Sequence, residues 1–90
     1  MNASFWEKFM MTADLDAETV KDTPFIEIYG NSRAYMENYG GIISCTDEEI
    51  AVKTKIGISR IIGKNMTISR ITDQYLVITG IIVQVIQEVQ

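Results

Sequence analysis

Histidine is absent from this 90-residue chain, and cysteine and proline each occur once. Without histidine, neither a Ser-His-Asp nor a Cys-His catalytic arrangement can form, and imidazole metal sites are excluded. The single cysteine, Cys45, excludes an intrachain disulfide, a CxxC redox pair and a cysteine zinc site. Because Cys45 ends an apolar run, we expect it to be a small buried residue. The chain is therefore predicted to be no enzyme, with no cofactor and no metal.

Positive charge is also scarce, because eight Lys and Arg residues stand against twelve Asp and Glu and give a net charge of −4. Such a chain lacks the basic surface that binds phosphate backbones, so nucleic acid is not expected as a partner. The longest apolar run, residues 75–83, is broken by Thr79 and Gly80 and falls short of the ~20 residues of a spanning helix. No signal peptide is visible. We expect a soluble cytoplasmic protein without a membrane span.

β-branched residues dominate what is present: 15 isoleucines, 6 valines and 8 threonines stand against 2 leucines. Such side chains suit a pleated sheet better than a helix. Apolar and polar residues alternate in short runs, and turn residues separate the runs. The pattern predicts an all-β fold, an antiparallel meander forming a small sheet, sandwich or barrel. Its strands are expected near 25–29, 33–37, 42–45, 49–55, 58–62, 66–70, 75–79 and 81–88.

Two features leave the architecture open. Gly80 is either a turn between the last two strands or a bulge that bends one long strand. A Gly-Ile-Ile-like pattern also recurs about every 20 residues, near 41–43, 61–63 and 80–82, which is within the range of solenoid repeats. A small β-solenoid is therefore the alternative fold.

The first 23 residues differ from the rest of the chain. Phe5, Trp6 and Phe9 recur at helical spacing and predict a short amphipathic helix over residues 4–11. We divide the chain into an N-terminal amphipathic and acidic segment, residues 1–23, and a β domain, residues 24–90. The aromatic stripe either packs on the domain or contacts a partner, and its three residues are candidate partner contacts.

Three short segments match the sequence motifs of known binding or catalytic sites only in part. Residues 57–64 carry five residues between two glycines where a phosphate loop has four, and no helix is predicted to follow. The acidic run of residues 14–18 has a threonine, Thr19, where a calcium loop needs glycine. Residues 47–49 are acidic but have no further group nearby for acid–base chemistry. None of these segments is predicted to be a site.

From Pro24 onward the order of these features is similar to that of a known family. The matching segments are 24–31, 35–38, 41–43, 50–54, 62–68 and 75–82, together with Gly57. In this order they resemble the YabP/YqfC family of sporulation proteins, and Asp22 before the proline resembles the YqfC-like branch. Tyr39 and Gly40 depart from the family pattern, which commonly has basic or histidine residues there.

The resemblance implies a non-enzymatic protein of the mother cell in spore-forming Firmicutes, acting in spore morphogenesis as an assembly or scaffold factor. It implies a cytoplasmic location peripheral to the forespore envelope and a membrane-bound, YqfD-like partner. Unpaired sheet edges favour a homo-oligomer as well. At the family's motif positions, Glu37 and Asn38 are candidate partner contacts. The candidate structural turns are Gly30, Gly41, Gly63 and Gly80.

An alternative function starts from the tyrosines. Tyr29, Tyr35 and Tyr39 would form a stacking platform for glycan or peptidoglycan fragments if they share one face of the sheet. Tyr35 and Tyr39 share a face only if the chain does not turn at Asn38.

Overall fold

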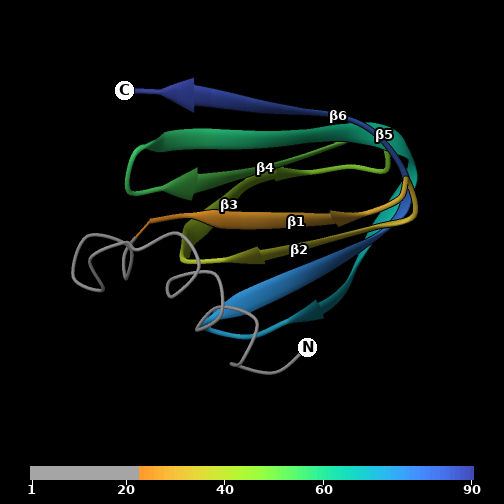
Figure 1. Ribbon diagram of the computed structural model, residues 1–90, viewed down its shortest axis with the longest axis horizontal. Coiled ribbons are helices and arrows are strands. Elements are labelled where there is room, and N and C mark those ends of the chain that lie inside the picture. The colour runs from red at the N-terminus through yellow and green to blue at the C-terminus, as the bar shows by residue number, and fades with distance from the viewer. Residues whose placement is uncertain (1–22) are drawn as a thin grey trace.

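Residues 23–90, the part of the chain that the computed structural model describes, form one open antiparallel sheet of six strands (Figure 1). The strands are β1 (Phe25–Tyr29), β2 (Arg33–Glu37), β3 (Tyr39–Cys45), β4 (Glu49–Thr54), β5 (Gly57–Ile71) and β6 (Tyr75–Val89). Their order in the sheet is β1-β2-β6-β5-β4-β3. The predicted all-β class is confirmed. The β-solenoid alternative is wrong, because solenoid rungs stack in parallel whereas each pair here is antiparallel.

β5 and β6 are 15 residues long each and form a hairpin that bends sharply in its middle (Figure 1). At the bend two residues of β5, Asn65 and Met66, lie opposite the single residue Gly80 of β6. Such a bulge bends the strand that carries the extra residue. The bend divides the sheet into a β3–β4 half, built on the start of β5 and the end of β6, and a β1–β2 half, built on the end of β5 and the start of β6.

The bend explains why six strands replace the eight predicted. Residues 63–65 were expected to be a turn, but the chain continues in the same direction through them as part of β5. Gly80 lies opposite the bulge of β5 and is no turn, so the two strands predicted on either side of it are one strand, β6. Alternation and turn residues mark a reversal and a bulge alike, so the sequence pattern does not distinguish them.

The hydrophobic core lies between the two halves of the sheet. It contains side chains from β2, β4, β5 and β6, namely Ala34, Met36, Ile50, Val52, Ile61, Met66, Leu76, Ile78 and Ile82. Successive residues of a strand point to opposite faces, so each of these strands presents its other residues outward. The molecule therefore has two outer faces, one on each half.

Two turns are fastened to the bend by backbone hydrogen bonds. In the turn between β3 and β4, the carbonyl of Glu48 accepts from the amide of Gly63 at 3.0 Å. In the turn between β1 and β2, the carbonyl of Asn31 accepts from the amide of Ile82 at 2.7 Å. The acidic turn at residues 47–49 thus has a structural role at the bend.

The predicted helix over residues 4–11 lies outside the described residues. Within residues 23–90, no helix of the length and hydrophobicity needed to cross a membrane occurs.

Candidate functional site: a tyrosine–arginine depression

Two of the five residues proposed as partner contacts, Glu37 and Asn38, can be placed. Phe5, Trp6 and Phe9 lie outside the described residues. Glu37 ends β2, and its carboxylate accepts a hydrogen bond from the Tyr35 hydroxyl at 2.5 Å. Asn38 has a φ of 63°, and its side-chain amide donates to the carbonyl of Thr23 at 2.8 Å. The side chains of Glu37 and Asn38 therefore already bind neighbours in their own chain.

The four candidate glycines have different surroundings. A Cβ on Gly63 would lie 2.0 Å from the carbonyl oxygen of Ile81, and a Cβ on Gly80, which has a φ of +135°, would lie 2.6 Å from that of Asn65. Both positions lie within the bend. Gly30 has a φ of +57° in the turn between β1 and β2, whereas Gly41 lies inside β3 with no atom within 4 Å of an added Cβ.

The strands at the two ends of the strand order, β1 and β3, are edges of the sheet. The end of β5 after Ile62 and the end of β6 after Thr79 also pair with one strand only, which is the other of the two. β3 exposes the large apolar side chains of Ile42 and Ile43, at 42% and 51% of their surface. Cys45, at the end of the same strand, is free and exposed, so the expectation that it is buried is wrong. An edge strand is covered on one side only, which explains why its apolar run is not part of the core.

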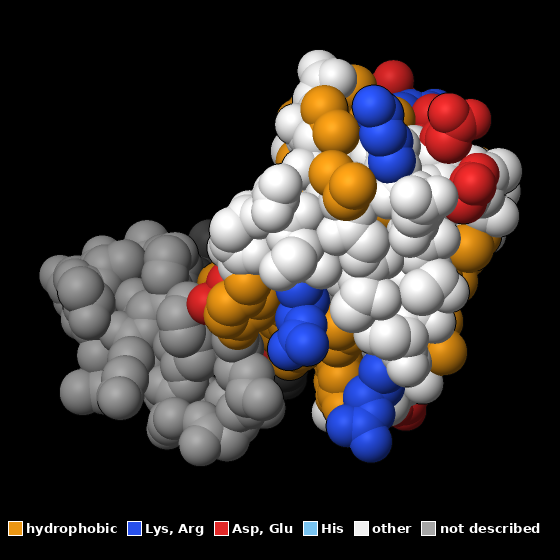
Figure 2. All heavy atoms as spheres, turned by 90° about the vertical axis from the view of Figure 1, so that its right-hand side faces the viewer, with side chains coloured by type: hydrophobic (Ala, Val, Ile, Leu, Met, Phe, Trp, Pro, Cys, Tyr) orange, Lys and Arg blue, Asp and Glu red, His pale blue; other side chains and the backbone are white. Residues whose placement is uncertain are grey.

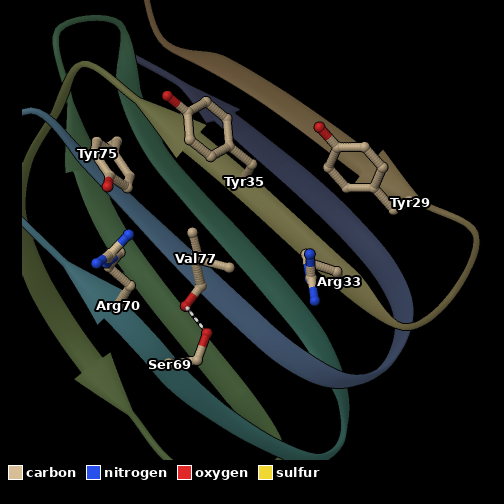
Figure 3. A pocket seen from close by; sticks show the side chains of 7 residues that line it. All are labelled: Tyr29, Arg33, Tyr35, Ser69, Arg70, Tyr75 and Val77. Carbon is tan, nitrogen blue, oxygen red and sulfur yellow. Dashed lines mark hydrogen bonds between the residues drawn. The ribbon is translucent and has the colours of Figure 1, made fainter. Parts of the chain in front are cut away.

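The outer face of the β1–β2 half carries a shallow depression of about 330 Å³ (Figure 3). Side chains from four strands line it: Tyr29, Arg33, Tyr35, Ser69, Arg70, Tyr75 and Val77. Register explains the grouping, because Val77 pairs with Tyr35 on one side and with Arg70 on the other. Arg70 and Tyr75 lie on one side of Val77 and Arg33 on the other, toward Tyr29 (Figure 3). We call this surface the tyrosine–arginine depression.

The tyrosine rings pack against one another and against their neighbours. The ring of Tyr35 lies 5.3 Å from that of Tyr75 and meets Phe25 edge-on at 6.5 Å, between ring centroids. Tyr35 is 9% exposed although it points away from the core, whereas Tyr29 is 40% exposed. Tyr35 therefore forms a fixed wall of the depression, and Tyr29 is the more exposed of the two tyrosines.

Carboxylates beside the depression bind the tyrosine hydroxyls. Burial, together with the hydrogen bond to Glu37, raises the pKa of Tyr35 well above its ordinary value. The hydrogen bond to Glu27 likewise raises the pKa of Tyr29. Both hydroxyls therefore stay protonated, as hydrogen-bond donors, to a higher pH than an ordinary tyrosine.

The tyrosine platform predicted from the sequence is correct for two of its three members. Tyr29 and Tyr35 line the depression, but Tyr39 packs against the core on β3, and its hydroxyl donates to the carbonyl of Thr72. The chain leaves β2 at Asn38, so Tyr39 belongs to the other half of the sheet. Tyr75 occupies the place expected for Tyr39.

The sequence reasoning missed Arg33, Arg70 and Tyr75. Alternation alone places Arg33 on the same face as Tyr35, so that signal was available. Arg70 and Tyr75 join them only through the pairing of β2 with β6 and of β6 with β5, which no local pattern specifies.

A model of the YabP family matches residues 21–87, about three quarters of the chain. The chain belongs to the YabP family. Membership of this family suggests a sporulation-related protein. No curated protein and no solved structure gives a significant match to the chain.

The YabP match includes both edge strands and every residue that lines the tyrosine–arginine depression. It is a match to the family as a whole, and the YqfC-like branch stays a prediction. Within residues 23–90, no three Cys, Asp or Glu side chains gather where they would hold a metal ion. What the described surface offers is aromatic rings, guanidinium groups and free strand edges, which are groups that bind other molecules.

Proposed function

We propose that this YabP-family protein is a non-enzymatic assembly or scaffold factor of spore morphogenesis, acting in the mother cell through contacts with other proteins. Its location would be cytoplasmic and peripheral to the forespore envelope. Its partners would be further copies of the chain, a membrane-bound YqfD-like protein, or both. Family membership supports the link to sporulation.

The observation that carries the assembly role is the β3 edge. An edge strand presents unpaired backbone donors and acceptors, which pair readily with a strand of another chain. On β3 these groups accompany the exposed side chains of Ile42 and Ile43, so a strand added there would also bury apolar surface. A marginally sized β domain gains stability from such pairing.

Ile43→Lys tests this role, because a charged side chain on an edge strand opposes strand addition. Val83→Lys is the matched control, since Val83 is 63% exposed and lies away from β3, on the end of β6 that pairs with β5 alone. We expect Ile43→Lys to shift the sedimenting species toward the monomer and Val83→Lys to leave it unchanged. Equal assembly of both variants would contradict the β3 edge as the contact.

The sporulation role is tested by deleting the gene in its host and counting heat-resistant spores. We expect a large loss that the wild-type gene and Val83→Lys restore and that Ile43→Lys does not. An unchanged count after deletion would contradict a required role in spore morphogenesis.

The tyrosine–arginine depression supports a second candidate function, the binding of glycan or peptidoglycan fragments. Tyr29 and Tyr75 lie on one face beside Arg33 and Arg70, and sugar C–H groups pack on the negative faces of aromatic rings. Titration with N-acetylglucosamine oligomers should shift the amide NMR signals of β1, β2 and β6. Absence of any shift at millimolar ligand would contradict this function.

A further inference from the structure

The two arginines of the depression lack partners in the described chain. No hydrogen bond or ion pair joins the side chain of Arg33 or Arg70 to another of residues 23–90. The nearby carboxylates of Glu27 and Glu37 accept from the hydroxyls of tyrosines instead. Seen from the bend, acidic and basic side chains lie together at the upper end, whereas the Lys and Arg side chains lower down lie beside hydrophobic ones (Figure 2).

Unpaired guanidinium groups beside aromatic rings favour an anionic ligand with an apolar face. A guanidinium presents donors in a planar fork that matches the two oxygens of a carboxylate. Arg33 and Arg70 flank Val77, so the floor between the two cations is apolar (Figure 3). A ligand here would place a ring against the tyrosines and its negative charge at a guanidinium group.

The position of the depression favours a small ligand over an extended peptide. Its volume of about 330 Å³ is near the lower end of the roughly 300–1,000 Å³ of small-molecule sites. Arg33 and Val77 lie on segments of β2 and β6 that pair with a strand on both sides, whereas Arg70 lies on the end of β5, which pairs with β6 alone. The backbone groups of Arg33 and Val77 are therefore used within the sheet, so a peptide strand could not pair along the floor of the depression as it does at an edge.

We propose that the tyrosine–arginine depression binds a carboxylated saccharide, with the sugar ring against Tyr75 and the carboxylate at the neighbouring guanidinium group of Arg70, across Val77 from Arg33. This inference rests on the glycan-binding candidate function and names its ligand class. It is independent of assembly through the β3 edge.

The test compares two sugars that differ in the carboxylate, N-acetylmuramic acid and N-acetylglucosamine, by NMR titration of the full chain. Because charge-assisted hydrogen bonds are the stronger ones, the acidic sugar should bind roughly tenfold more tightly. Arg33→Gln/Arg70→Gln should abolish that difference. The matched control, Lys53→Gln/Lys64→Gln, removes the same charge from exposed positions outside the depression and should preserve it.

The results distinguish the carboxylate assignment from glycan binding in general. Equal binding of both sugars, unchanged by loss of the arginines, overturns the carboxylate assignment and leaves glycan binding standing. No binding of either sugar overturns both. A hexaglutamate peptide that binds the same residues more tightly than the acidic sugar also overturns the inference and assigns the surface to an acidic protein.

Discussion

The two outer faces of the folded sheet use arginine in opposite ways. On the β3–β4 half, Arg60 lies between two carboxylates and contacts Glu49 and Glu88 at 3.0 Å each. On the β1–β2 half, Arg33 and Arg70 have no such contact within residues 23–90, and tyrosine hydroxyls occupy the carboxylates of Glu27 and Glu37. Ion pairs of Arg60 thus join β5 to β4 and β6 on one face, whereas Arg33 and Arg70 on the other face form no ion pair within the described residues.

The difference shows which face is suited to binding. The guanidinium of Arg60 already donates hydrogen bonds to the carboxylates of Glu88 on β6 and Glu49 on β4, and these raise its pKa further. An external anion would have to compete with those carboxylates. No comparable competition exists at Arg33 and Arg70, so binding there leaves the fold intact.

The two outer faces exist because the bend folds the two halves of the sheet together. A substitution that disrupts the bend should therefore have the largest effect on stability. In Gly80→Ala, a residue with a Cβ would have to adopt a φ of +135°, and its Cβ would lie 2.6 Å from the carbonyl oxygen of Asn65. We expect the free energy of unfolding to fall by roughly 3 kcal/mol or more, measured by urea denaturation.

Gly41→Ala is the control for Gly80→Ala, since nothing lies within 4 Å of its added Cβ. Its effect should stay within about 0.5 kcal/mol. A similar loss in both variants would show that the bend has no special requirement at Gly80.

The bend also marks the limit of what the sequence predicts. Composition and alternation predict the strand class, and Ile50, Val52, Leu76 and Ile78 are core residues on their alternating faces. The order of the strands depends on β2 pairing with β6, about 40 residues away, and local patterns carry no information on such a partner. Cys45 shows the same limit, because its exposure follows from β3 being an edge.

Only part of the candidate site can be predicted from the sequence, for the same reason. Tyr29 and Tyr35 come from neighbouring strands of one hairpin, and alternation places both on the outer face. Tyr39 follows Asn38, whose φ of 63° redirects the chain into the other half. Arg70 and Tyr75 reach the depression through long-range register.

Tyr35 should make the stability of the β1–β2 half sensitive to alkaline pH. Its hydroxyl loses a proton near pH 10 in the unfolded chain, but burial and the bond to Glu37 raise its pKa in the folded protein. Stability is therefore fully present below pH 10 and falls as the pH rises beyond it, by about 1.4 kcal/mol per pH unit.

Denaturation of wild type and Tyr35→Phe from neutral pH to pH 11 would measure this contribution. The variant lacks the titrating hydroxyl, so its alkaline decline should be shallower than that of the wild type. Parallel curves would contradict a buried, neutral Tyr35. Tyr29→Phe is the exposed control and should change the slope less, because Tyr29 is 40% exposed.

Removing the arginines one at a time should have the smallest effect on stability and gives the most direct comparison of the two faces. Arg60→Gln removes the ion pairs with Glu49 and Glu88, whereas Arg33→Gln removes no side-chain hydrogen bond or ion pair within the described chain. Exposed ion pairs stabilise weakly, so Arg60→Gln should lower the melting temperature by roughly a few degrees. The difference from wild type should shrink in 1 M salt, which screens charges beyond about 3 Å. Arg33→Gln should melt with the wild type at any salt concentration, and an equal loss in both variants would mean that the cations of the two faces are held alike.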